Sequence, residues 1–189
     1  SQLILASNSY INVEYTKQSR KIKLIAGEIY IKTAKDPYKR PFFVSTSNGD
    51  LEALGTQFTV RQEKKKTKLN VYEHAVAIHS AEPAREKIIK QGFRAVFNAQ
   101  HISNAIPLKN DQPYWTQHLL VVENWPLKKV LHELYRYQQG TYFIDPSIEN
   151  IQISGVFSLI HIDQSLEAIA HANSLNLEFY SPYILHVKK

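Results

Sequence analysis

The last third of the chain has the clearest pattern of apolar and polar positions. Leu119 to Glu123 is a short run rich in β-branched residues, and such a run predicts a strand. Pro126 follows, and proline suits the first position of a helix because its missing N–H would have no partner there. Charged residues then separate apolar residues at helical spacing: Leu127, Val130, Leu131 and Leu134. Tyr142 to Ile144 predicts a second strand, so the segment is a strand–helix–strand unit.

The same pattern occurs a second time. Leu166-x-x-Ile169-Ala170 repeats Leu127-x-x-Val130-Leu131 at an offset of 39 residues. Asp163 is the expected N-cap of the second helix. Neither predicted helix is long enough to be stable alone, so each is expected to pack on a sheet. The second copy and the end of the chain predict four elements: a strand Ile151–Phe157, a helix Gln164–Ser174, a strand Leu177–Tyr180 and a final strand Tyr183–Val187.

The first hundred residues predict strands almost throughout. Short runs rich in isoleucine, valine and tyrosine are separated by turn residues, among them Gly27. This spacing predicts an antiparallel sandwich or a stack of hairpins. Asn104 to Pro113 contains two prolines and several polar residues, which is typical of a linker. We therefore predict a β-rich domain over residues 1–110 and a domain of two β-α-β repeats over residues 111–189. The fold class is mainly β plus α+β.

Composition narrows the possible classes of protein. With 189 residues, 43% of them hydrophobic, the chain can form one large or two modest domains. It has no apolar run long enough to span a bilayer and no signal peptide. The absence of cysteine excludes a disulfide framework, a thiol nucleophile and a thiolate metal site. Because the chain opens on Ser1 without an initiator methionine, we expect it to be part of a longer protein.

The net charge of +6 does not by itself indicate a nucleic-acid partner. The densest basic cluster, Lys64-Lys65-Lys66 with Lys68, lies between two predicted strands, and a solvated hairpin tip explains it. No aromatic residues are interleaved with these lysines, although such residues are typical of single-strand binding. We expect no nucleic-acid partner.

Sequence motifs for catalysis are absent. The chain has no phosphate-binding glycine loop, no nucleophile elbow and no paired-histidine metal motif. Its eight histidines are scattered. We therefore predict no catalytic residues, no metal and no cofactor, and a protein that is not an enzyme. The eleven tyrosines leave one alternative open, a glycan-binding β-sandwich of the cell envelope with an exposed aromatic row.

Several segments resemble, in chain order, motifs of the FecR family, and together they cover essentially the whole chain. Arg20–Lys32, with Gly27-Glu28-Ile29-Tyr30, resembles "R-x-L-x-L-x-x-G-E-x-Y-F". Arg40-Pro41-Phe42-Phe43-Val44 resembles "R-P-F-x-V", and Leu54–Val60 matches "L-G-T-x-F-x-V" closely. The resemblance continues in the C-terminal region through Trp115, Leu120, Pro126, Leu127, Arg136-Tyr137 and Ser154-Gly155-Val156-Phe157.

Three positions depart from the family pattern. His74 stands where the family has glycine in "V-x-E-G-x-V", and His118 stands where "W-x-x-G" has glycine. If these residues need a positive φ, histidine carries a steric cost that glycine avoids. Val122 replaces the usual aromatic residue, a change that a core can absorb by repacking.

The resemblance implies a role in signalling. FecR-like proteins are inner-membrane regulators of extracytoplasmic-function sigma factors. A cytoplasmic head binds the sigma factor, and a single membrane helix follows it. A periplasmic region then receives a signal from the signalling domain of a TonB-dependent outer-membrane transporter, often one for iron–siderophore complexes. This chain resembles the periplasmic region alone, so the head and the membrane anchor would lie outside it. The doubled unit resembles the short N-terminal fold of secretins and TonB-dependent receptors, called the STN fold.

We expect the C-terminal domain to be the docking module. An edge strand can accept a partner strand through backbone hydrogen bonds, and the candidate edges are Leu119–Glu123 and Tyr183–Val187. Exposed aromatic residues would anchor the partner, unless they belong to the core or are scattered over the surface. The candidate partner-binding residues are Leu119, Val121, Phe157, Phe179, Tyr180, Tyr183 and Leu185.

Overall fold

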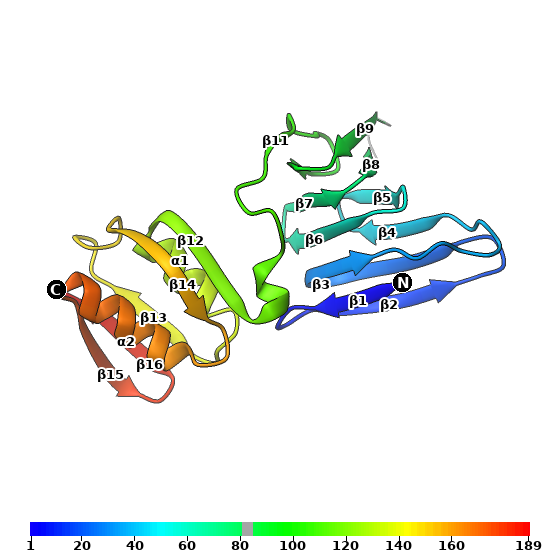
Figure 1. Ribbon diagram of the computed structural model, residues 1–189. Helices are drawn as coiled ribbons and strands as arrows, with labels where there is room; N and C mark the ends of the chain where they lie inside the picture. Colours follow the sequence, from blue (N-terminus) through cyan, green and yellow to red (C-terminus); the bar gives the residue numbers. More distant parts are fainter. Residues whose placement is uncertain (81–84) are drawn as a thin grey trace. The chain divides into compact units, whose positions relative to one another are not determined.

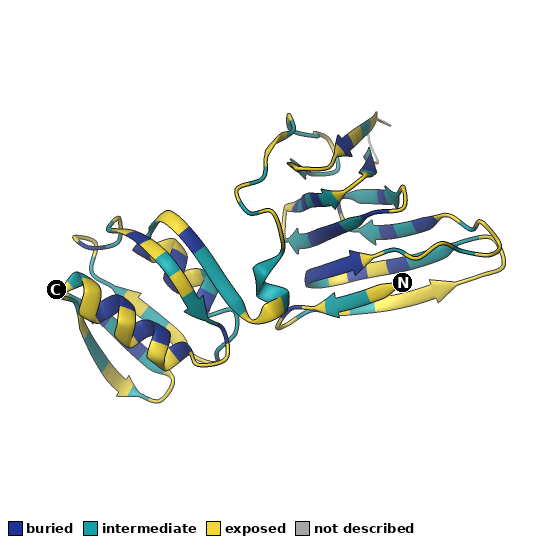
Figure 2. Cartoon of the chain, viewed as in Figure 1, coloured by how far each residue is buried: buried dark blue, intermediate teal, exposed yellow. Residues whose placement is uncertain are grey.

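The chain folds into two compact units, Ser1–Pro113 and Tyr114–Lys189. The structure is a computed structural model that describes residues 1–80 and 85–189 (Figure 1). Each unit has its own cluster of buried apolar residues, shown in dark blue in Figure 2.

The N-terminal unit is a curled β-sheet. Its strands in the described residues are β1 (Gln2–Leu5), β2 (Tyr10–Tyr15), β3 (Arg20–Lys32), β4 (Phe42–Thr46), β5 (Gly49–Ala53), β6 (Gln57–Glu63), β7 (Lys66–Glu73), β8 (Ala75–Ser80), β9 (Arg85–Lys90), β10 (Phe93–Phe97) and β11 (Ile106–Pro107). The strand order is β11-β10-β7-β6-β3-β4-β5-β8-β9, with β1 and β2 also paired to β3. The neighbours are antiparallel except for β3 and β4, which run parallel. The prediction of a mainly β unit is confirmed.

Strand β3 joins the two halves of this sheet. The prediction of two strands separated by a turn at Gly27 is wrong, because Arg20–Lys32 forms one continuous strand. Gly27 has a φ of 90°, and a Cβ there would lie 2.3 Å from the Ser9 hydroxyl oxygen. That hydroxyl accepts a hydrogen bond from the Glu28 N–H and donates one to the Glu28 carbonyl. Gly27 therefore provides close packing against Ser9 within a strand that continues on both sides of it.

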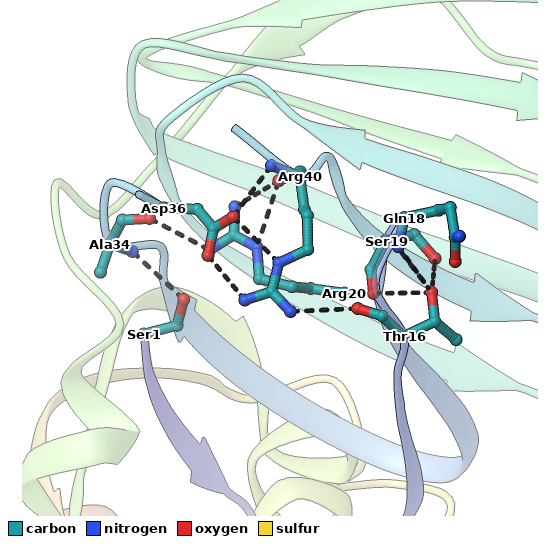
Figure 3. Close-up of polar contacts among 8 residues, drawn as sticks. All are labelled: Ser1, Thr16, Gln18, Ser19, Arg20, Ala34, Asp36 and Arg40. Carbon is teal, nitrogen blue, oxygen red and sulfur yellow. Dashed lines mark hydrogen bonds and ion pairs between the residues drawn. The ribbon is translucent and has the colours of Figure 1, made fainter. Parts of the chain in front are cut away.

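Two arginines of the FecR-like motifs meet beside β3. Arg20 donates from Nε and Nη2 to the Arg40 carbonyl, at 3.2 and 2.9 Å (Figure 3). Arg40 in turn donates from Nε and Nη2 to the two carboxylate oxygens of Asp36, at 3.0 and 2.8 Å. A further bond from Arg40 Nη1 reaches the Thr16 carbonyl, at 3.0 Å. This arginine clasp, made of Arg20, Asp36 and Arg40, ties the β2–β3 turn to the β3–β4 loop.

The two histidines at family glycine positions both have positive φ angles, 50° for His74 and 59° for His118. Both side chains are exposed, so the chain accepts the strain without a clash in the core. Each of these histidines therefore carries the steric cost expected of a side chain at positive φ. Val122, at the third departure from the family pattern, is buried in the C-terminal core.

The C-terminal unit contains its elements in the predicted order. They are η1 (Tyr114–Gln117), β12 (Leu119–Pro126), α1 (Leu127–Leu134), β13 (Thr141–Ile144), β14 (Gln152–Ser158), α2 (Ile162–Asn173), β15 (Asn176–Ser181) and β16 (Ile184–Lys188). Two helix starts differ from the prediction by one or two residues. Pro126 is the N-cap of α1 and not its first residue. Asp163 lies in the first turn of α2, whose N-cap is His161.

The pairing of these strands mixes the two strand–helix–strand copies. Strands β12 and β14 form an antiparallel two-stranded sheet. A second sheet has the order β13-β16-β15, in which β13 is parallel and β15 antiparallel to β16. Each copy thus gives its first strand to one sheet and its second strand to the other. This pairing does not confirm two self-contained β-α-β repeats.

The apolar faces of both helices pack in one core with residues from both sheets. The apolar stripe of α1 is fully buried, as the periodicity predicted. Ile162, Leu166 and Ile169 of α2 join it, together with Val122 of β12 and Leu185 of β16. In the described part of the chain, no helix is both long and apolar enough to cross a membrane.

Candidate partner-binding surface

Strand β12 has one unpaired edge in the described residues. It pairs with β14 on one side only. The Leu159 N–H donates to the His118 carbonyl at 2.8 Å, and these two residues continue the β12–β14 register. In an antiparallel ladder the hydrogen-bonded pairs alternate with pairs that exchange no bonds. The peptide groups of Leu119 and Val121 therefore point away from β14.

The side chains of these two residues lie on the outer face of the two-stranded sheet. The side chain of Val122 points from β12 into the core, so Leu119 and Val121, at alternate positions, point to the opposite face. Val121 lies across from Val156 of β14, which is 62% exposed. We call Leu119, Val121 and Val156 the β12 edge patch. Sequence reasoning missed Val156, although its alternation with Ile153 and Phe157 along β14 was visible.

Phe157 is partly buried and packs against the C-terminal core. It lies opposite Leu120, and both side chains pack against the C-terminal core. Gly155 gives its ring space, because a Cβ at Gly155 would lie 3.0 Å from the ring. For Phe157, this packing favours the alternative that some of the candidate aromatic residues belong to the core.

The prediction of an edge at Tyr183–Val187 is wrong. Strand β16 lies between β13 and β15, so both of its sides are paired. Leu185 is fully buried and cannot contact a partner in this fold. An edge strand and a central strand have the same sequence pattern here. The strand β16 is central because β13, from an earlier part of the chain, pairs with it in parallel.

Phe179, Tyr180 and Tyr183 are exposed, as an anchoring role requires. Each is at least half exposed, and they lie on edge strand β15 and in the turn that follows it. A shift of register between Phe179 and Ser181 accounts for two successive exposed aromatic residues. The structure therefore leaves these three aromatics accessible, but on the other sheet from Leu119 and Val121.

Polar side chains in contact with one another lie beside the exposed aromatic residues of the three-stranded sheet. His186 lies opposite Phe143 of β13, which is 58% exposed and was missed by sequence reasoning. The Nε2 atom of His186 is 2.9 Å from an Asp145 carboxylate oxygen. The Tyr180 ring stacks on the His186 ring, with 6.2 Å between the ring centroids.

Lys188 and Glu178 form a charged pair on this sheet. Lys188 Nζ donates to the Glu178 carboxylate at 2.7 Å. This hydrogen bond and the positive charge of Lys188 lower the pKa of Glu178, and the same bond and the negative charge of Glu178 raise the pKa of Lys188. Both groups therefore stay charged at neutral pH, and the sheet offers aromatic rings among balanced charges.

Metal binding has no candidate group in residues 1–80 and 85–189. No cluster of three or more histidine, cysteine, aspartate or glutamate residues there could hold a metal ion. The accessible features of the C-terminal unit are an open backbone edge and exposed aromatic rings, and such features serve protein recognition.

Residues 1–77 match the model of the family described as FecR protein. This range includes the three N-terminal motifs that carried the resemblance, which is thereby confirmed for residues 1–77. A comparison with curated proteins gave no match.

Two solved structures share the fold of the whole chain. One is the 1.65 Å crystal structure of a candidate anti-sigma factor from Parabacteroides distasonis ATCC 8503. Its TM-score is 0.74 at 22% identity, and the match covers 99% of this chain and 89% of that one. The other, at 2.50 Å, is described in the same words and comes from the same organism. Its TM-score is 0.69 at 19% identity, with 100% and 98% covered. At identities of 22% and 19%, the likeness to these two structures shows a shared fold.

Proposed function

We propose that this chain is the periplasmic sensor region of an inner-membrane regulator of an extracytoplasmic-function sigma factor. The FecR match over residues 1–77 supports this role, and so does the description of both structural neighbours as candidate anti-sigma factors. The regulator would contact the sigma factor through a cytoplasmic head outside this chain. The signal would come from a TonB-dependent outer-membrane transporter, in cell-surface signalling for iron–siderophore uptake.

The C-terminal unit is, in this proposal, an STN-like docking module for the transporter's signalling domain. Its repeated strand–helix–strand order and its two small sheets support that assignment. Small sheets leave edges unpaired, and an unpaired edge accepts a strand from another protein.

The β12 edge carries the proposal. The backbone groups of Leu119 and Val121 point away from β14, and their side chains form an apolar patch with Val156. A partner strand beside β12 would therefore gain backbone hydrogen bonds and apolar contacts together. A standard interface buries about 800 Å² on each partner, so the bound domain would cover residues beyond this strand.

Two proline substitutions test which edge is used. Val121 and Val156 face each other in a pair that exchanges no hydrogen bonds, so proline at either position removes only an outward N–H. Binding of purified transporter signalling domains from the same organism would be measured by titration calorimetry. We expect Val121→Pro to weaken binding at least ten-fold. Val156→Pro changes a side chain of the patch but leaves the β12 edge intact, so it should weaken binding several-fold less than Val121→Pro. The reverse order of effects would place docking on β14 and contradict the proposal.

A further inference from the structure

Strand β2 is an edge strand with exposed apolar side chains. The β1–β2 segment follows β3 along its length, and in the described residues β2 pairs with no other strand. Tyr10, Val13 and Tyr15 are 64%, 59% and 49% exposed. Edge strands are normally protected against association by lysine, proline or a bulge. The Ile11–Tyr15 part of β2 contains none of these, and Glu14 is its single charged residue.

The outward peptide groups of β2 follow from its turn. The Thr16 N–H donates to the Ser19 carbonyl at 2.9 Å and closes the β2–β3 hairpin. The hydrogen-bonded pairs of this ladder therefore recur at every second position, which gives Glu14 with Lys21 and Asn12 with Lys23. The residues that alternate with these pairs therefore have peptide groups that point away from β3: Ile11, Val13 and Tyr15.

We propose that β2 joins two copies of this chain into a symmetric dimer, as an antiparallel pair with the two-fold axis at Val13. Ile11 then lies opposite Tyr15 of the second copy, and Val13 lies opposite Val13. The two-fold axis also gives the symmetry-related pair of Tyr15 with Ile11. All three pairs use outward peptide groups, so each pair can exchange two hydrogen bonds. Contact between identical surfaces of two subunits is the commonest form of protein oligomer.

The side chains of β2 are complementary to themselves in this register. Ile11, Val13 and Tyr15 share the face that carries buried Ile22 and Leu24, so apolar residues meet apolar residues across the axis. On the other face, Glu14 would lie opposite Asn12 of the second copy. A register shifted by two residues, with the axis at Glu14, would place two carboxylates directly opposite each other, which is unfavourable.

Single cysteine substitutions test the register directly, because the chain contains no cysteine. In a hydrogen-bonded antiparallel pair the Cα atoms lie about 5.5 Å apart, within the range of about 4.4–6.8 Å that a disulfide spans. Two copies of residue 12 would lie ~8 Å apart, given the rise along a strand and the spacing between strands. Under mild oxidation, Val13→Cys should give a disulfide-linked dimer at least ten times faster than Asn12→Cys. Equal rates, or faster linking at residue 12, would overturn the register.

Light scattering after size-exclusion chromatography tests the dimer itself. The unmodified chain should elute with twice the mass of one chain at high micromolar concentration. Val13→Pro removes the central outward N–H and leaves the bonds to β3 intact, so it should give a monomer. Val156→Pro, at an equally exposed valine of another edge, should stay dimeric. A monomeric unmodified chain, or a dimeric Val13→Pro chain with unchanged circular dichroism, would overturn the proposal.

Transporter binding by Val13→Pro separates this inference from the proposed function. Because β2 and β12 belong to different units, Val13→Pro should keep its affinity for the signalling domain while losing self-association. A loss of both activities would show that β2 is not a separate interface and would overturn the dimer proposal.

Discussion

The Arg20 guanidinium donates two hydrogen bonds to a single acceptor, the main-chain carbonyl of Arg40. A third bond from Arg20 reaches the Ala34 carbonyl at 3.1 Å. Arg20 therefore holds both ends of the β3–β4 loop, while Arg40 holds Asp36 in its middle. The arginines of two FecR-like motifs thus act together on one loop and need no bound partner to explain them.

Replacing Arg20 should destabilise the N-terminal unit. Lysine at this position keeps the charge but cannot make the same forked contacts. We expect Arg20→Lys to lower the free energy of unfolding by about 1–2 kcal/mol, as for the loss of charge-assisted hydrogen bonds. Urea unfolding would measure it, with Lys17→Ala on the exposed β2–β3 turn as the control. An unchanged urea midpoint for Arg20→Lys would contradict the clasp.

The Asp36–Arg40 pair should make stability depend on acid pH. The hydrogen bonds from the Arg40 side chain and backbone hold the pKa of Asp36 well below its usual 3.8. Because the folded-state pKa is the lower one, the stabilisation is complete above about pH 4 and is lost as the pH falls. Asp36→Asn should therefore reduce the loss of stability between about pH 4 and 2. The free energy of unfolding in urea would be measured across this pH range. If the pair contributes nothing, this free energy would fall with pH at the same rate in both proteins.

Glycine at positions 74 and 118 should stabilise the two units separately. The left-handed conformation costs a residue with a Cβ about 1–2 kcal/mol, and the entropy that glycine loses on folding offsets about 0.5–1 kcal/mol. We expect His74→Gly and His118→Gly each to raise the unfolding free energy by roughly 0.5–1 kcal/mol. The matched control is His132→Gly on the exposed face of α1, which should destabilise by a few tenths of a kcal/mol, because glycine is a poorer helix former than histidine. Destabilisation by all three would show that the positive φ angles carry no strain.

The separate cores predict separate unfolding. Leu131 is buried in the C-terminal core and is not part of the core of the N-terminal unit. Leu131→Ala should lower the stability of residues 114–189 by about 2–5 kcal/mol and leave the N-terminal unit unaffected. Hydrogen exchange followed by mass spectrometry would locate the loss of protection. Equal loss in β6 and β7 would mean that the two units unfold together.

The α1 stripe was predictable because its information is local. Apolar residues three and four positions apart form one face of any helix, whatever packs against it. The positive φ of His74 and His118 was likewise indicated by the family pattern. Val122 and Phe157 were harder to assign, since a strand residue is buried or exposed according to which face of the sheet meets the core.

The sequence by itself determined the kinds of elements, their order and the buried face of each helix, because those depend on neighbours along the chain. Only the tertiary structure decided that β16 is a central strand, that β3 continues through Gly27 and that β2 and β12 keep one open edge. Those outcomes depend on pairing between segments far apart in sequence, as when Phe143 meets His186. A single strand looks the same along the chain whether one or both of its sides are paired, and so the edges became visible only in the fold.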